Sequence, residues 1–110
     1  MIVKSFKDAI KQISNIIEIE KIAVYNGNKV KFSNFEHKEM NKIFRSIETA
    51  LNNIGFDIEC QELEIHNGNK LLKFFLNNGN ILVIKFTTDQ IINKMIINDG
   101  VSAIFQFINT

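Results

Sequence analysis

Apolar residues recur along this chain with two periods, and the switch between the periods defines the expected elements. Apolar side chains at three- and four-residue spacing predict a helix over residues 6–17 and a second helix of about 18 residues that ends at Gly55. Five short runs predict strands, and they span residues 21–25, 29–32, 58–66, 70–76 and 81–86. The order is therefore helix, two strands, helix, three strands and a last apolar segment.

The sequence Asn-Gly-Asn occurs three times, each time between two expected strands, at residues 26–28, 67–69 and 78–80. A type I′ hairpin turn requires positive φ at both central residues, which Asn and Gly tolerate best. Each copy therefore predicts a hairpin turn centred on Asn-Gly, and the strands on its two sides are expected to pair.

Capping signals mark where the helices begin and end. Ser5 with Asp8 three residues later resembles a capping box, and Ser33 with Glu36 forms a better one before the second helix. Gly55 follows the last apolar position of that helix, where helices commonly end in a left-handed residue.

Two of the strands differ in polarity. Residues 58–66 are mostly polar and include Glu59, Glu62 and Glu64, which suits a sheet edge because charge discourages unwanted pairing there. Residues 81–86 are nearly all apolar, which predicts a central strand that is buried on both faces.

The last segment, residues 90–108, has two apolar stripes that are out of phase, and the change falls at residues 98–100. The stripes consist of Ile91, Ile92, Met95 and Ile96, and of Val101, Ile104, Phe105 and Ile108. A third helix, capped by Thr88 or Asp89, is expected to kink or break at the change. The alternatives are one unbroken helix, or a fourth hairpin turn at Asp99-Gly100 followed by a strand over residues 101–107.

The composition fits one small α+β domain over residues 1–110, and it also limits the classes of partner that we expect. The net charge is +1 with both signs interspersed, so the basic stripe of nucleic-acid-binding proteins is missing and no nucleic-acid partner is expected. The single Cys60 cannot form an internal disulfide, which suits a reducing compartment. No signal peptide is visible, and the apolar runs are far shorter than the ~20 residues of a membrane helix. We expect a cytoplasmic protein without membrane insertion.

No catalytic constellation stands out, so the chain is expected to be no enzyme and to hold no cofactor or metal. His37 and His66 belong to no HExxH-type pair, and both are read as solvated surface residues. Cys60 has no neighbour that predicts a lowered pKa, and it is read as half-buried filler. The glycines form no phosphate-binding loop pattern, and the serines lack a nucleophile-elbow context.

The unusual feature is the long second helix followed by residues 58–66. One side of the helix carries mixed polar residues that are able to pair with a partner, namely Glu39, Lys42, Arg45, Ser46, Glu48 and Thr49. An edge strand offers unpaired backbone groups to which another chain can add. An ordinary solvated helix beside a charge-protected edge remains an alternative explanation of the same pattern.

The order of elements resembles the roadblock family of small domains, which includes the roadblock-type dynein light chains. The resemblance covers nearly the whole chain: the short helix before Ile22-Ala23-Val24-Tyr25, the Asn-Gly turn, the long helix ending at Gly55, and the hairpins over residues 63–72 and 78–84. It implies a single five-stranded antiparallel sheet with helices on both faces, edged by the second and third strands, with the fifth strand central or nearly so. Longin, profilin-like and PAS-like domains have related layouts.

The resemblance also implies a function. Roadblock-like domains typically dimerise through the second helix and third strand, and the dimers are platforms or regulators for small Ras-like GTPases, or adaptors in larger complexes. For this chain it implies a non-enzymatic homodimer with an interface at Met40, Ile43, Phe44, Arg45, Ile47, Glu48, Leu51, Gln61, Leu63 and Ile65. Arg45 is the only Arg in the chain, and we do not expect it to be an arginine finger.

The acidic strand fits this expectation less well. Three glutamates near a two-fold axis repel one another unless they face Lys38, Lys42 or Arg45 of the partner copy. The alternative function is a small-molecule sensor with a PAS-like or profilin-like sheet, and a purely structural subunit is a third reading. The ligand pocket of a sensor would be lined by Phe74, Phe75, Phe86, Phe105 and Phe107, although plain core packing explains the same residues.

Overall fold

The computed structural model describes residues 3–27, 29–54, 61–68 and 70–108. The helices and strands follow one another in the expected order. They are α1 (Phe6–Ser14), β1 (Ile19–Asn26), β2 (Lys29–Ser33), α2 (His37–Ile54), β3 (Gln61–Asn67), β4 (Lys70–Asn77), β5 (Asn80–Phe86) and α3 (Lys94–Phe107). The expected helix end at Gly55 and the expected strand start at residues 58–60 lie outside the described residues.

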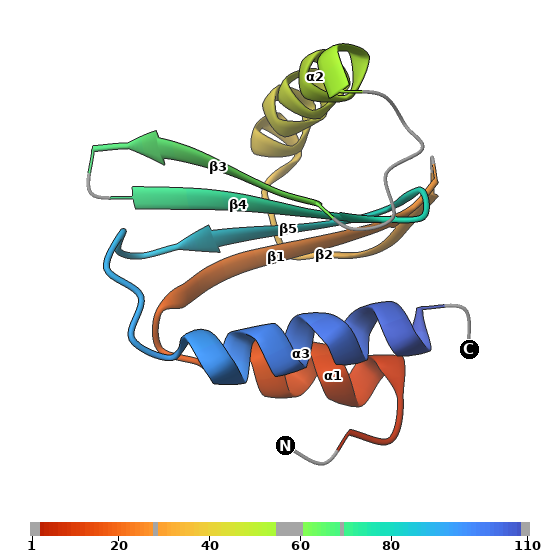
Figure 1. Ribbon diagram of the computed structural model, residues 1–110, viewed down its shortest axis with the longest axis vertical. Coiled ribbons are helices and arrows are strands. Elements are labelled where there is room, and N and C mark those ends of the chain that lie inside the picture. Colours follow the sequence, from red (N-terminus) through yellow and green to blue (C-terminus); the bar gives the residue numbers. More distant parts are fainter. Residues whose placement is uncertain (1–2, 28, 55–60, 69, 109–110) are drawn as a thin grey trace.

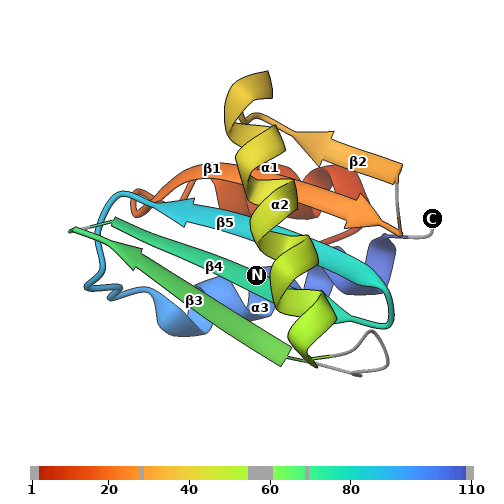
Figure 2. The same cartoon turned by 90° about the horizontal axis from the view of Figure 1, so that it is seen from above.

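The five strands form one antiparallel sheet in the order β2-β1-β5-β4-β3. β5 is central and is buried at every position over residues 81–84, which confirms the prediction of a strand covered on both faces. β2 and β3 form the two edges, as expected. Figure 2 shows that α2 crosses this sheet from the β2 side to the β3 side.

Helices cover both faces of the sheet, with α2 on one face and α1 with α3 on the other (Figure 1). Successive residues of a strand point to opposite faces, so each inner strand contributes to two cores. Val24 and Ile84 pack with α1 and α3, whereas Tyr25 and Val83 pack beneath α2. The predicted α+β class, with a single five-stranded antiparallel sheet, is confirmed.

The hairpin turns have positive φ at the glycines, but two of them are shifted by one residue from the prediction. Gly27 and Gly68 have φ of 61° and 64°, and each is the first residue of its turn, because Asn26 pairs with Lys29 and Asn67 with Lys70. The third turn is centred on Asn78-Gly79 as predicted, with φ of 50° and 81°. Moving the centre of a turn by one residue changes the pairing by two residues, which leaves every side chain on its face of the sheet, so the alternation of apolar residues does not distinguish the two registers.

The first helix is shorter than predicted. The Ser5 hydroxyl accepts a hydrogen bond from the Asp8 amide at 3.1 Å, which confirms the cap, but α1 ends at Ser14 instead of residue 17. Residues beyond Ser14 turn the chain into β1, and the Ile17 side chain is 86 % exposed. The apolar spacing continues past the helix because Ile16 packs against the core from the turn that leads into β1, where Ile19 is buried.

The capping box expected at Ser33 and Glu36 is wrong. Ser33 is the last residue of β2, and its hydroxyl accepts a hydrogen bond from the Phe35 amide and donates one to Met40 Sδ. Asn34 instead extends the β1–β2 ladder, because its side-chain oxygen accepts a hydrogen bond from the Ile22 amide at 2.7 Å. α2 therefore begins at His37, and its length of 18 residues matches the prediction.

The last segment forms one unbroken helix, so the expected kink and the alternative hairpin are both wrong. α3 runs from Lys94 to Phe107 through Gly100, and its N-cap is Asn93, so the expected cap at Thr88 or Asp89 is also wrong. A Cβ at Gly100 would lie 3.1 Å from Cδ1 of Ile13 in α1, so this glycine permits a close contact between the two helices. The first of the two apolar stripes is largely exposed and the second is buried, which explains why they are out of phase without a break.

Candidate functional site

The two edge strands differ in how well they are protected against pairing. β2 has only five residues, a register shift opposite Val24 and Tyr25, and exposed lysines at positions 29 and 31. Short length, bulges and lysines are the features by which proteins block edge pairing. β3 has seven residues in uninterrupted register with β4, from Gln61 opposite Leu76 to Asn67 opposite Lys70. β3 is therefore the more open edge.

Leu63 and Ile65, two of the predicted interface residues on β3, lie on the α2 side of the sheet. Leu63 is half-buried and packs against the core beneath α2, whereas Ile65 is 42 % exposed. Ile65 also borders a hollow of about 430 Å³ beneath the start of α2, beside Lys42 and Lys70. Of the two, Ile65 is the side chain that is available to a partner.

The predicted interface residues on α2 separate into inward and outward groups. Met40 and Ile43 are 9 % and 7 % exposed and pack against the sheet, so they hold the helix in place. Arg45 is exposed. The other predicted positions have side chains outside the described part of the chain, and they are Phe44, Ile47, Glu48, Leu51 and Gln61.

Two ion pairs fix the start of α2 on the sheet. Glu39 receives hydrogen bonds from Lys85 of β5 at 3.0 Å and from Lys21 of β1 at 3.1 Å. The hydrogen bond from Lys85, followed by that from Lys21, holds the pKa of Glu39 below its ordinary 4.5, and Glu39 in turn raises the pKa of Lys85. Lys85 also lies 3.4 Å from Glu20.

The acidic residues of β3 face away from α2, toward the side of the sheet that carries α1 and α3. Lys73 of β4 lies opposite them, with Nζ at 3.4 Å from Glu62 and 3.5 Å from Glu64. The Lys73 side chain is only 18 % exposed, and its Nζ lies 5.5 Å from the centre of the Phe75 ring. Lys73 thus compensates part of the charge of Glu62 and Glu64 within the chain, while Glu59 lies outside the described residues.

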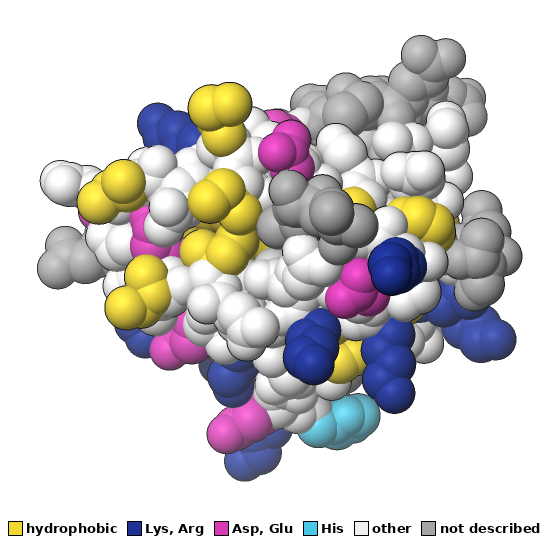
Figure 3. All heavy atoms as spheres, turned by 90° about the horizontal axis from the view of Figure 1, so that it is seen from below, with side chains coloured by type: hydrophobic (Ala, Val, Ile, Leu, Met, Phe, Trp, Pro, Cys, Tyr) yellow, Lys and Arg dark blue, Asp and Glu magenta, His cyan; other side chains and the backbone are white. Residues whose placement is uncertain are grey.

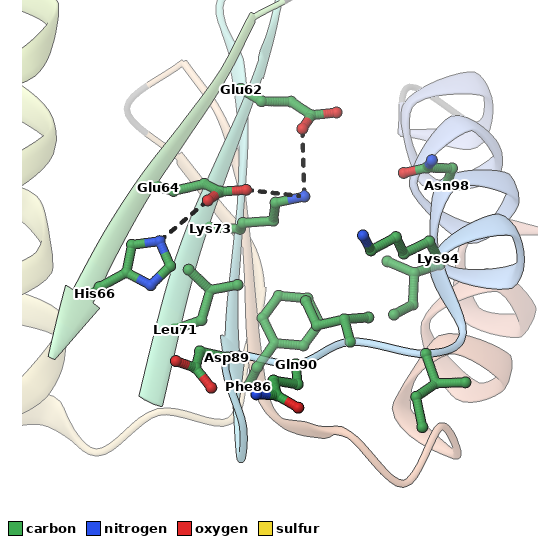
Figure 4. A pocket seen from close by; sticks show the side chains of 13 residues that line it. Glu62, Glu64, His66, Leu71, Lys73, Phe86, Asp89, Gln90, Lys94 and Asn98 are labelled. Carbon is green, nitrogen blue, oxygen red and sulfur yellow. Dashed lines mark hydrogen bonds and ion pairs between the residues drawn. The ribbon is translucent and has the colours of Figure 1, made fainter. Parts of the chain in front are cut away.

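These residues form one wall of a groove between β3 and α3, which Figure 4 shows. The groove has a volume of about 550 Å³. Glu62, Glu64 and Lys73 point into it from the sheet, and Lys94 and Asn98 of α3 face them from the other side. Its apolar floor consists of Leu71, Phe86, Ile91 and Ile97. A second hollow of about 430 Å³ adjoins it, shares Glu62 and Asn98, and is lined by Phe75 and Phe105.

The histidines occupy the surface positions expected from the sequence. His37 is the exposed first residue of α2, and His66 contacts Glu64 at 3.2 Å with over half of its side chain exposed. Within the described ranges, no group of three or more His, Cys, Asp or Glu residues is placed to hold a metal ion. Cys60 lies outside those ranges. No helix in the described part of the chain combines the length and apolar character needed to span a bilayer.

Glu18 is a structural residue that sequence reasoning missed. Its side chain is 7 % exposed, and its carboxylate accepts hydrogen bonds from the Ile92 amide and from the amide and side chain of Asn93, the N-cap of α3. Burial works to raise the pKa of Glu18, but these hydrogen bonds outweigh it and hold the pKa below 4.5. The sequence signal was a lone acidic residue within the apolar run Ile16-Ile17-Glu18-Ile19.

An exposed apolar patch surrounds the same junction. Figure 3 shows apolar side chains gathered on the helical face where α1 ends and α3 begins. Its members include Ile17, Ile92 and Met95, which are 86 %, 88 % and 81 % exposed, together with Ile96. Met95 and Ile96 lie in α3 but point to solvent instead of the core, and Ile92, which was expected on the same helical face, precedes the helix.

Comparison of the sequence with protein-family models and with curated proteins finds no match in either.

Proposed function

We propose that this protein is a non-enzymatic, dimeric interaction module of the roadblock type, and that it is a cytoplasmic platform or regulator for a small Ras-like GTPase or an adaptor subunit of a larger complex. The dimer forms when β3 pairs with β3 of a second copy around a two-fold axis, so that two sheets become one. α2 of each copy lies on the same face of that sheet and flanks the junction.

The observation that carries this proposal is the contrast between the two edges of the sheet. β2 is short, bulged and lysine-rich, whereas β3 has an uninterrupted register, and no strand of the described ranges pairs with its outer edge. Lys73 compensates one of the two charges of Glu62 and Glu64, which lowers the electrostatic cost of bringing two β3 strands together. Ile65 adds an exposed apolar side chain on the α2 side.

Solution mass tests the dimer. At micromolar concentration the wild-type protein is expected to sediment as a dimer, and Ile65→Glu is expected to shift it to monomer, because it removes the apolar contact and places a charge that must be desolvated at the junction. Ile92→Glu is the matched control, because it places the same charge at an exposed isoleucine of the helical patch. A monomeric wild type, or a dimer that Ile92→Glu disrupts and Ile65→Glu leaves intact, contradicts the proposed interface.

Partner capture tests the GTPase assignment. Wild-type protein immobilised against a lysate of the source organism should retain a protein that carries the GxxxxGK[ST] phosphate-binding loop. Ile65→Glu should retain much less of it, because the platform requires the dimer. Acceleration of GTP hydrolysis would come from orienting the partner's own groups. Retention of no nucleotide-binding protein would contradict this assignment while leaving the dimer result intact.

A second candidate function, a small-molecule sensor, is favoured by the groove between β3 and α3. Its volume of about 550 Å³ falls within the range of ligand sites. Three of the five phenylalanines named for such a pocket line it or the adjoining hollow, namely Phe86, Phe75 and Phe105. Phe74 is buried beneath α2 and Phe107 borders a separate hollow.

A further inference from the structure

The walls of the groove between β3 and α3 carry charges of both signs around an apolar floor. Among the described lining residues, three carboxylates stand against two ammonium groups, which leaves one negative charge when His66 is neutral. The carboxylates belong to Glu62, Glu64 and Asp89, and the ammonium groups to Lys73 and Lys94. A simple anion is therefore disfavoured, and a ligand with a cationic group is favoured.

Of the two lysines, Lys73 occupies the more unusual position, because it lies on the core-facing side of an inner strand. Its distances to Glu62 and Glu64, 3.4 and 3.5 Å, are longer than the ~2.7–2.9 Å of a charge-assisted hydrogen bond. The two carboxylates, each about half exposed, thus retain acceptor capacity toward the groove. By contrast, Glu39 on the other face is held by its two lysines at 3.0 and 3.1 Å.

Lys94 supplies a positive charge on the opposite wall. It extends from the first turn of α3 toward Glu62 and Lys73 (Figure 4), and it makes no ion pair within the described ranges. A ligand that brings only a cation would leave this ammonium group unused. A ligand with both charges matches both walls.

From this arrangement we propose that the groove binds a free α-amino acid with an apolar side chain. The ligand ammonium group lies against Glu62 and Glu64, its carboxylate lies against Lys94, and its side chain covers the floor formed by Leu71, Phe86 and Ile97. The inference supplies a ligand class for the sensor function and goes beyond the dimer proposal, because the groove lies on the sheet face opposite α2.

Calorimetric titration with leucine and two derivatives tests whether binding requires both the ammonium group and the carboxylate of the ligand. Leucine is expected to bind, whereas leucinamide, which lacks the carboxylate, and N-acetyl-leucine, which lacks the ammonium group, should each bind at least about tenfold more weakly. Leucinamide that binds as tightly as leucine would overturn the proposal and indicate recognition of a peptide N-terminus. N-acetyl-leucine that binds as tightly would overturn it as well.

Substitutions in the two walls of the groove test whether their charged residues bind the ligand. Lys94→Met and Glu64→Gln should each weaken leucine binding at least about tenfold, and circular dichroism should confirm that both remain folded. Lys7→Met, at an exposed position of α1, is the matched control and should leave binding unchanged. Absence of leucine binding in a folded wild-type protein overturns this ligand class. If this protein binds no leucine but Ile65→Glu still converts the dimer to monomer, the ligand class is overturned and the proposed dimer is supported.

Discussion

At the scale of single residues, the least predictable feature is a buried carboxylate that joins distant parts of the chain. Glu18 precedes β1, yet it receives hydrogen bonds from Ile92 and Asn93, more than seventy positions later in the sequence. The first amides of a helix lack intrahelical acceptors, and negative charge near them is favourable. Glu18 therefore stabilises the start of α3 from outside the helix, which no local pattern around Asn93 could predict.

Replacing Glu18 with Gln should lower the free energy of unfolding by about 1–3 kcal/mol at neutral pH, because three donors then meet a side chain with one acceptor. The folded-state pKa of Glu18 is depressed, so its contribution is complete above the unfolded-state value near 4.5 and is lost as the pH falls through the folded-state value. The stability gap between wild type and Glu18→Gln should therefore narrow in acid, as measured by urea unfolding.

Glu36→Gln serves as the control for that measurement. Glu36 is exposed and its replacement should change stability by only a few tenths of a kcal/mol at any pH. Glu39 also has a depressed pKa, so wild-type protein will lose stability in acid for that reason too; the difference between wild type and variant isolates Glu18. A gap that stays constant from neutral to acidic pH would contradict the assigned role.

At the scale of elements, the packing of α1 on α3 explains a glycine that looked like a break. Gly100 lies inside α3, where glycine costs about 1 kcal/mol relative to alanine. A Cβ at this position would approach Cδ1 and Cγ1 of Ile13 at 3.1 and 3.2 Å. The helix therefore tolerates glycine because it lets α1 approach, and the sequence pattern around Asn98-Asp99-Gly100 reflects tertiary packing.

A double-mutant cycle tests this contact. Gly100→Ala should gain helix propensity but lose more through the clash with Ile13, and Ile13→Val alone should cost about 0.5–1.5 kcal/mol. Because Ile13→Val removes the nearest atom, the double variant should be more stable than the sum of the single effects by about 0.5 kcal/mol or more. Gly100→Ala combined with Ile10→Val should be additive, and additivity in both cycles would refute the contact.

At the scale of the whole molecule, β3 serves two surfaces because successive side chains of a strand point to opposite faces. Ile65 faces the α2 side, where the dimer is proposed, while Glu62 and Glu64 face the groove beside α3. The two surfaces share a strand but no described side chain of β3. Variants of one surface should therefore leave the other readout unchanged, and the dimer and the ligand can be tested in the same protein preparation.

Local patterns predicted most of the fold. The apolar periods gave the order of the elements, the length of α2 and the buried character of β5, and the Ser5 cap formed as expected. The predictions were wrong where segments that are distant in the sequence pack together. Ser33 was assigned to the wrong element because its hydroxyl bonds to Met40, and α1 was extended because Ile17 continues the apolar spacing while facing solvent.

The candidate surfaces were predicted less completely than the fold. The α2–β3 region was singled out from length and polarity, but burial showed that Met40 and Ile43 face inward and that Ile65 faces outward. The groove could not be predicted, since its walls come from β3 and β4 on one side and α3 on the other. His66 and Lys94 lie far apart in the sequence and line the same groove only through the sheet order and the placement of α3.

The sequence alone determined which segments become helices and strands, because periodicity, turn residues and caps act over a few neighbouring residues. Tertiary structure decided the hairpin register at Gly27 and Gly68, the continuity of α3 through Gly100 and the pairing of Lys73 with Glu62 and Glu64. Each of these depends on which side chains from distant segments share a face. That sharing is fixed by the order β2-β1-β5-β4-β3 and by the helices packed on it.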